Sequence, residues 1–207
     1  MTIDEILAAG PVMPVVVIDD AAHAVPLAKA LVAGGITAIE ITLRTGAALD
    51  AIQAIARDVP DAIPGVGTAV TEADVLAALD AGAKFIVSPG MTPALRDAAT
   101  RSGLPFLPGV ATATELMAGM ATGLSAFKFF PAAQAGGIDG LKALGGPFPS
   151  IRFCPTGGVS AANAAAYLAL PNVACVGGSW LAPRETIAAG DFAKIEGLAR
   201  EAAGLRG

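Results

Sequence analysis

Short β-rich runs alternate with alanine-rich helical runs along most of the chain. Valine, isoleucine and phenylalanine dominate the first kind of run, and the segments between them have the length and composition of helices. The pattern predicts eight strands, at Pro14–Ile18, Ala38–Thr42, Ile63–Gly67, Phe85–Ser88, Phe106–Gly109, Ala126–Phe130, Arg152–Pro155 and Val173–Gly177. It predicts helices at Ala22–Ala33, Ala47–Asp58, Glu72–Ala81, Pro93–Arg101, Ala113–Thr122, Gly137–Leu144 and Ala161–Ala169, a helical region broken near Gly190 at Pro183–Ala203, and an extra leading helix at Thr2–Ala9.

Strands that alternate with helices form parallel βαβ units. Eight such units in 207 residues predict one domain over residues 1–207, an α/β fold of the single (β/α)8 TIM barrel type with an extra N-terminal helix. An open doubly wound sheet is the alternative. In such barrels the active site lies where strands end and the following loops begin, so those positions are where chemistry is expected.

The composition raises the question of a membrane protein, because 54% of residues are hydrophobic and 15% are charged. No charged residue lies between Arg152 and Arg184, but prolines, glycines and asparagines divide that stretch. A spanning helix needs about 20 mostly apolar residues with an intact backbone ladder. The N-terminus also lacks the basic region of a signal peptide. We expect a soluble, cytoplasmic protein that does not bind a membrane.

A net charge of −5 argues against nucleic acid as a partner, because phosphate backbones select lysine- and arginine-rich surfaces. It leaves small anionic ligands open, since these need only one local site. The single histidine, His23, excludes a histidine-rich metal centre.

Glu40 interrupts an apolar predicted strand, where a carboxylate is costly unless it is paired or used. Glu40, Thr42 and Arg44 fall on one face of an extended chain. One interpretation is a structural Glu40–Arg44 ion pair. The other is an acid–base carboxylate beside a guanidinium that holds an anion.

Lys128 interrupts the aromatic run Ala126–Pro131 near the end of the sixth predicted strand. Apolar surroundings favour the neutral amine, which is the nucleophile that forms a Schiff base. The alternatives are a lysine that extends to solvent or one that pairs with a carboxylate. The other lysines lie on helical runs or before a strand.

Three glycine-containing segments follow strands. In Gly65–Thr68, two glycines would let a ligand approach the backbone, although a tight turn needs the same residues. The turns in Pro155–Ser160 and Val176–Trp180 follow the last two strands, which is the common phosphate site of barrel enzymes. The two turns together predict a phosphate site made of backbone N–H groups.

Taken together, these segments resemble the 2-dehydro-3-deoxy-6-phosphogluconate (KDPG) aldolase family, the KDPG/KHG aldolases. The resemblance runs from about Gly10 to Arg200, and it is carried by the segments Glu40–Thr45, Gly65–Thr68, Ser88–Gly90, Leu107–Gly109, Phe127–Pro131, Arg152–Gly158 and Gly177–Trp180. It implies a metal-independent, cofactor-free lyase that forms a Schiff base and yields pyruvate and glyceraldehyde 3-phosphate. A side activity on 4-hydroxy-2-oxoglutarate and a homotrimer are further implications.

The same resemblance implies a role for each matching residue. Lys128 would form the Schiff base and Glu40 would move protons. Residues implied to hold the pyruvate portion are Arg44, Thr68, Phe130 and Thr156, and those implied to hold the phosphate are Gly157, Gly158, Gly178 and Ser179. A phosphosugar isomerase or synthase, and a non-catalytic phosphosugar-binding barrel, remain the alternatives.

Overall fold

The computed structural model describes residues 1–206, an α/β fold built on a curled parallel sheet. Its strands are β1 (Val12–Val16), β2 (Ala38–Thr42), β3 (Ile63–Gly67), β4 (Ile86–Val87), β5 (Phe106–Leu107), β6 (Gly109–Val110), β7 (Ala126–Phe129), β8 (Arg152–Pro155) and β9 (Val176–Gly178). Six of them form one sheet in the order β5-β4-β3-β2-β1-β9, and three form a second sheet in the order β6-β7-β8. Neighbouring strands within both sheets run parallel.

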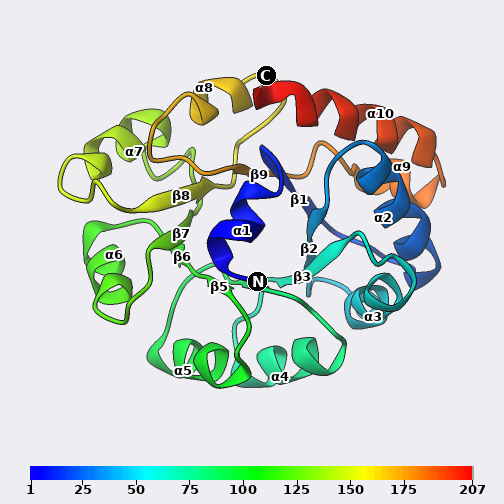
Figure 1. The fold of residues 1–207 in the computed structure, drawn as a ribbon, viewed down its shortest axis with the longest axis horizontal. Coiled ribbons are helices and arrows are strands. Elements are labelled where there is room, and N and C mark those ends of the chain that lie inside the picture. The colour runs from blue at the N-terminus through cyan, green and yellow to red at the C-terminus, as the bar shows by residue number, and fades with distance from the viewer. Residues whose placement is uncertain (207) are drawn as a thin grey trace.

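The two sheets lie against one another at both edges. Pro108 alone separates β5 from β6 along the chain, and isolated bridges join Phe153 to Val173 and Thr156 to Gly177 near β8 and β9. Figure 1 accordingly shows the strands curling around the middle of the molecule.

Helices surround the strands. They are α1 (Ile3–Ala8), α2 (Ala24–Ala33), α3 (Ala48–Asp58), α4 (Glu72–Asp80), α5 (Pro93–Ser102), α6 (Ala113–Met120), α7 (Gly137–Gly145), α8 (Ala164–Leu168), α9 (Arg184–Ala188) and α10 (Phe192–Ala203), with 3-10 turns η1 (Ala21–His23) and η2 (Gly204–Arg206). Figure 1 shows α2 to α10 on the outside, whereas α1 crosses the middle of the view. Helix α1 therefore has a different position from the helices that cover the outside of the sheet.

Period-two alternation divides the buried residues into two clusters. Ile39 and Ile41 of β2 belong to the large cluster beneath the outer helices, as do Phe127 and Phe129 of β7. The smaller cluster contains the alternate strand positions together with two side chains of α1, and its members are Ile6, Leu7, Met13, Ala38, Phe85, Val87, Leu107, Ala126, Cys154, Ala174 and Cys175. Helix α1 therefore packs onto the inner face of the curled sheet, near the strand starts.

The strand boundaries differ most from the predicted ones in three strands, and the fourth and sixth predicted strands are shortened to Ile86–Val87 and Ala126–Phe129. The first strand is Val12–Val16 rather than Pro14–Ile18, because Val12 aligns with Val176 of β9. The fifth predicted strand is divided at Pro108, which has no N–H to donate to a ladder. The last strand, Val176–Gly178, begins later than predicted, and Val173 contributes only an isolated bridge.

Within residues 1–206, no helix is both long enough and apolar enough to span a membrane. The uncharged stretch between Arg152 and Arg184 forms β8, α8 and β9. Its low charge follows from strands that are buried on both faces.

Candidate active site

Strands β2 and β7 bring Glu40 and Lys128 together across the inside of the sheet. The Nζ atom of Lys128 lies 3.0 Å from Oε1 and 3.4 Å from Oε2 of Glu40. The Lys128 side chain is 6% exposed and that of Glu40 is 2% exposed. Each side chain is two residues further along its strand than an alanine of the inner cluster, so the ion pair lies directly beyond that cluster.

Two of the sequence-based alternatives are therefore wrong. Glu40 does not pair with Arg44, because β2 ends at Thr42 and the chain then turns, with the Arg44 N–H donating to the Thr42 carbonyl at 2.8 Å. Arg44 is exposed at the pocket wall. Lys128 does not extend to solvent. Its pairing with a carboxylate, which the sequence left open, is confirmed.

Two glycines of β3 make room for neighbouring side chains. A Cβ atom on Gly67 would lie closer than 3.0 Å to the carboxylate and the Cγ atom of Glu40, and one on Gly65 would overlap the ring of Phe85. Side chains of the protein thus fill the space beside both glycines. Thr68 follows with φ of 62°, a left-handed conformation that is uncommon for a non-glycine residue.

Phe130 connects the buried ion pair to an open pocket. The Nζ atom of Lys128 lies 5.3 Å from the centroid of its ring, within the range of a cation–π interaction. Phe130 also lines a pocket of about 510 Å³, which is large enough for a small metabolite. Glu40, Lys128 and Thr68 are not on the pocket wall, so the ion pair lies behind Phe130.

Most of the pocket wall comes from the segment after β8 and from the segment that runs from β9 into α9. It is formed by Val15, Val17, Arg44, Phe130, Thr156, Gly157, Gly158, Val159, Gly177, Gly178, Ser179, Trp180, Ala182, Pro183, Arg184 and Glu185. Apart from Thr68, every residue that the sequence analysis assigned to substrate or phosphate binding is among them. The structure thus brings both predicted glycine turns to one pocket.

Thr156 depends on its neighbour in β9. Its side chain is buried, and its hydroxyl donates to the Cys154 carbonyl at 3.3 Å. A Cβ atom on Gly177 would overlap the Thr156 side chain, so Gly177 provides the space for it. Gly157 and Gly158 have φ values of 95° and 78°, and such turns direct backbone N–H groups toward an anion.

An ion pair that was not predicted from the sequence lies at the pocket rim. Arg184 donates from Nε and Nη2 to the two carboxylate oxygens of Asp19, at 2.6 and 2.5 Å. The hydrogen bond from Arg184 holds the pKa of the Asp19 carboxyl below its usual value. Asp19 follows β1 and Arg184 follows β9, so the expectation of chemistry after strand ends would have pointed to both.

Comparisons with known proteins all point to the same family of aldolases. The sequence profile of the family described as "KDPG and KHG aldolase" matches residues 3–198. A 2-dehydro-3-deoxy-phosphogluconate aldolase of Pseudoalteromonas atlantica is 56% identical over 96% of this chain and 92% of its own. The KHG/KDPG aldolase of Escherichia coli is 53% identical over 96% of this chain and 93% of its own.

The fold is also that of a solved aldolase. The KDPG aldolase of Legionella pneumophila, with pyruvate captured at low pH as a covalent carbinolamine intermediate, superposes with a TM-score of 0.96. It is 46% identical, and the match covers 99% of both chains. From the matched profile, the near full-length identities and this superposition, we conclude that the chain belongs to the KDPG and KHG aldolase family.

Proposed function

We propose that this protein is a class I aldolase that cleaves 2-dehydro-3-deoxy-6-phosphogluconate into pyruvate and glyceraldehyde 3-phosphate. The buried pair of Lys128 and Glu40, separated by 3.0 Å behind a pocket with two glycine turns, carries the proposal. The covalent carbinolamine that pyruvate forms in the Legionella relative supports the same route here.

The first step needs a neutral amine. Transfer of a proton from Lys128 Nζ to the Glu40 carboxylate leaves an amine and a carboxylic acid, and so removes both buried charges. The amine attacks the C2 ketone and gives a carbinolamine. Glu40 then returns its proton to the C2 oxygen, which leaves as water, and a protonated imine remains.

The imine accepts electrons in the second step. Glu40, again a carboxylate, takes the proton of the C4 hydroxyl as the C3–C4 bond breaks. The electron pair of that bond moves toward the iminium nitrogen, which forms an enamine and releases the aldehyde. Protonation at C3 and hydrolysis then release pyruvate and restore Lys128.

In this proposal, four further side chains bind the pyruvate portion of the substrate. Arg44 offers a guanidinium to the substrate carboxylate, and Thr68, next to Gly67, adds a hydroxyl. Phe130 packs against the apolar carbons, and Thr156 selects the configuration at C4.

The phosphate binds at the two glycine turns in this proposal. Gly157 and Gly158 have positive φ values. Gly178 ends β9 and Ser179 follows it, next to the Thr156 segment and on the same pocket wall. Backbone N–H groups in such turns bind anions without requiring a lysine.

We further propose that the strands close into one (β/α)8 barrel and that residues 1–207 are a single domain. The two bridges at β8 and β9, and the single residue between β5 and β6, support closure. In this interpretation β5 and β6 are two halves of one barrel strand, and α1 closes the end opposite the site.

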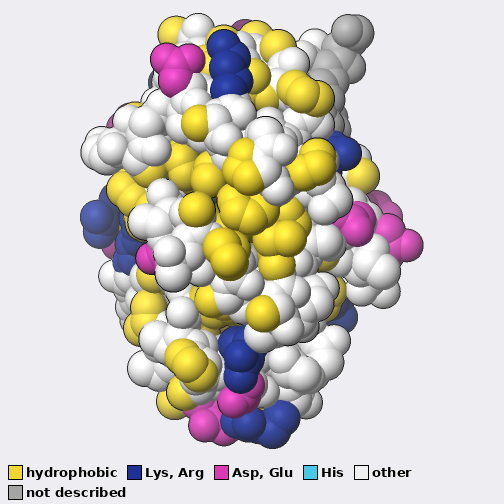
Figure 2. All heavy atoms as spheres, turned by 90° about the vertical axis from the view of Figure 1, so that its left-hand side faces the viewer, with side chains coloured by type: hydrophobic (Ala, Val, Ile, Leu, Met, Phe, Trp, Pro, Cys, Tyr) yellow, Lys and Arg dark blue, Asp and Glu magenta, His cyan; other side chains and the backbone are white. Residues whose placement is uncertain are grey.

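A homotrimer is the assembly that we propose. Hydrophobic side chains gather in the middle of the face that carries α6 and α7, which Figure 2 shows. Met117 of α6 is 59% exposed. A contiguous apolar patch on a surface is typical of a protein–protein contact. Sedimentation velocity of the purified protein would test the trimer.

We also propose that the enzyme acts in the cytoplasm. A doubly charged phosphate ester does not cross a membrane unaided. The enzyme is therefore expected in the compartment where its substrate is made.

Borohydride trapping with pyruvate tests the proposed function. The wild-type protein should gain a stable adduct that peptide mass spectrometry places on Lys128, and Lys128→Ala should gain none. If the wild-type protein is not modified, the Schiff-base route is wrong, and a phosphosugar isomerase or synthase, or a non-catalytic binding barrel, becomes the better interpretation.

Steady-state kinetics test the substrate. We expect kcat/KM to be highest for the phosphogluconate compound and lower for its galactonate epimer and for 4-hydroxy-2-oxoglutarate. A preference for the unphosphorylated acid would contradict the role of the glycine turns.

A further inference from the structure

Arg184 gives the pocket a cation that the glycine turns do not provide. The described pocket wall carries three charged side chains, namely Arg44, Arg184 and Glu185. Arg44 follows β2, whereas Arg184 begins α9, directly after the loop that follows Gly178 and Ser179. The two arginines therefore enter the pocket wall from different strands, and Arg184 belongs to the side proposed for the phosphate.

The contact with Asp19 leaves part of the guanidinium free to bind a ligand. Asp19 occupies the edge formed by Nε and Nη2. A guanidinium has five N–H donors, so both hydrogens of Nη1 and one of Nη2 remain free, and one hydrogen of each nitrogen lies on the outer edge. That edge matches two oxygens of a phosphate group.

The exposure of the Arg184–Asp19 ion pair indicates that it orients the arginine rather than stabilises the fold. The side chain of Arg184 is 63% exposed and that of Asp19 is 46% exposed. Ion pairs this exposed contribute little to folding stability. The bidentate geometry does, however, restrict a long side chain to one orientation, and a side chain held in place in advance binds a ligand at a smaller entropic cost.

We propose that Arg184, oriented by Asp19, binds the phosphate group of the substrate and is a determinant of selectivity for phosphorylated over unphosphorylated keto acids. This inference rests on the proposed aldolase function and assigns one further residue to its phosphate site. Glu185, on the same wall, opposes the anion.

Replacement of Arg184 by glutamine is the test. For the phosphorylated substrate, Arg184→Gln should raise KM by about 5- to 10-fold with little change in kcat. The variant loses a charge-assisted hydrogen bond to the phosphate that is equally strong in the substrate complex and in the transition state, so only substrate binding is weakened. For 4-hydroxy-2-oxoglutarate, KM should stay within about 2-fold. The Ki of inorganic phosphate should rise along with KM. Glu185→Gln should change KM for the phosphorylated substrate in the opposite direction, to a lower value, because it removes a negative charge from the same wall.

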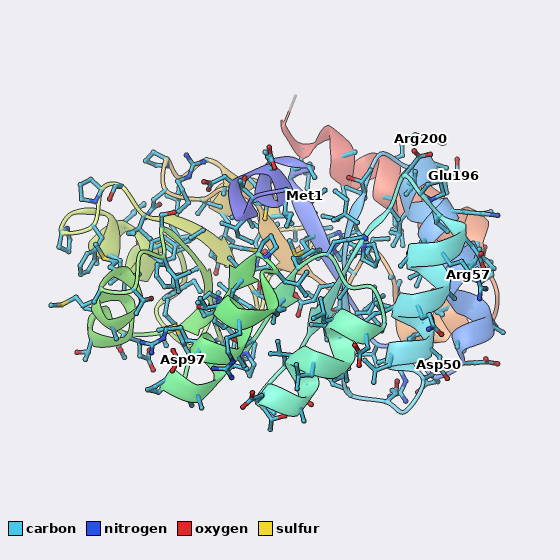
Figure 3. All side chains as sticks on the ribbon, turned by 60° about the horizontal axis from the view of Figure 1, so that its bottom comes forward. Met1, Asp50, Arg57, Asp97, Glu196 and Arg200 are labelled. Atoms are coloured by element: carbon cyan, nitrogen blue, oxygen red, sulfur yellow. The ribbon has the colours of Figure 1, made fainter. Side chains whose placement is uncertain are left out.

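Arg57→Gln is the matched control. Arg57 makes the same two-atom contact, with Asp58, at 2.8 and 2.7 Å. It lies on α3 at the outside of the molecule, as Figure 3 shows, and is not on the pocket wall. Arg57→Gln also removes one positive charge, so its KM shows how much the change in net charge alone affects substrate binding.

The outcomes separate this inference from the proposed function. Pyruvate carries no phosphate, so borohydride should trap it on Arg184→Gln as readily as on the wild-type protein. If trapping succeeds but Arg184→Gln has the KM of Arg57→Gln, or weakens both substrates equally, the role of Arg184 is wrong. If the wild-type protein is not trapped, the aldolase function itself is wrong.

Discussion

Lys128 and Glu40 are buried ions that depend on each other. Their carboxylate-to-ammonium distance of 3.0 Å offsets part of the cost of removing both charges from water. The same pairing keeps the amine next to a proton acceptor. Stability and chemistry are therefore linked at this one contact.

This linkage predicts non-additive stability effects. Lys128→Met leaves the Glu40 carboxyl group without its partner, and Glu40→Gln does the same to the Lys128 amine. Each variant should lower the free energy of unfolding by about 3–5 kcal/mol if the remaining group stays charged, and by less if that group becomes neutral. The double variant should lose less than the sum of the two single losses. Urea unfolding of the four proteins measures the coupling, and strictly additive losses would contradict a direct interaction.

Gly67 is a second residue-scale determinant, because its missing side chain leaves the space that Glu40 occupies. Gly67→Ala should displace the carboxylate and lower kcat by about 10- to 100-fold, since a small misplacement of a reacting group has effects of that size. Steady-state kinetics and pyruvate trapping measure the change.

Gly34→Ala is the control for Gly67→Ala. Its new Cβ would lie 2.8 Å from the Glu196 carbonyl oxygen on α10, away from the pocket wall. It should lower thermal stability and leave kcat unchanged. Equal losses of kcat in both variants would show that Gly67→Ala acts only by disturbing the fold.

At the scale of elements, capping boxes begin three of the helices. Thr2 with Glu5, Thr71 with Asp74 and Thr112 with Glu115 make the reciprocal contacts expected from their spacing. At α6, backbone N–H groups of Ala111 and Thr112 and the Thr112 hydroxyl lower the pKa of Glu115 from its ordinary value of 4.5. The start of α6 is therefore sensitive to acid.

Glu115→Gln tests this sensitivity. Because the pKa is lower in the folded state, the charged carboxylate stabilises the fold above pH 4.5, and that contribution is lost as the pH falls through the folded-state value. The wild-type protein should be more stable than Glu115→Gln by up to about 1 kcal/mol at pH 7. The difference should shrink as the pH falls below 4.5.

Urea unfolding between pH 7 and pH 4 provides the measurement. Glu201→Gln, an exposed change on α10, controls for the loss of one negative charge. A difference between Glu115→Gln and the wild-type protein that does not vary with pH would contradict the role of the carboxylate.

At the scale of the whole molecule, α1 packs into the inner cluster and the pocket lies beyond the strand ends. Leu7, which is 1% exposed, should therefore be important for stability and not for chemistry. Leu7→Ala should lower the thermal midpoint by about 5–15 °C, the effect of a loss of about 2–5 kcal/mol in a chain of this size.

Calorimetry and kinetics together check this separation. Well below the new midpoint, kcat of Leu7→Ala should equal that of the wild-type protein. Leu76→Ala is the control, because Leu76 of α4 is 52% exposed and its loss should hardly change the midpoint. A lower kcat of Leu7→Ala at temperatures where the variant is fully folded would contradict this separation and show that α1 affects the active site.

Local patterns were sufficient to predict the elements and the types of residue at the site. Alternation with period two placed Ile39 and Ile41 on one face of β2 and Glu40 on the other, and the two clusters confirm this division. The break near Gly190 was also correctly predicted. Each of these features depends on residues only a few positions apart.

Tertiary structure alone decided which side chains meet. Glu40 pairs with Lys128, 88 residues away, and not with Arg44, because the chain turns after Thr42. The register of β2 and β3 pairs Glu40 with Gly65 and Thr42 with Gly67, and the Glu40 carboxylate reaches the space beside Gly67. The segments after β1 and β9 bring Asp19 to Arg184. A strand pattern determines the face on which a side chain lies, but its partner across the interior depends on strand order, register and turn geometry, which the packing of the whole molecule sets.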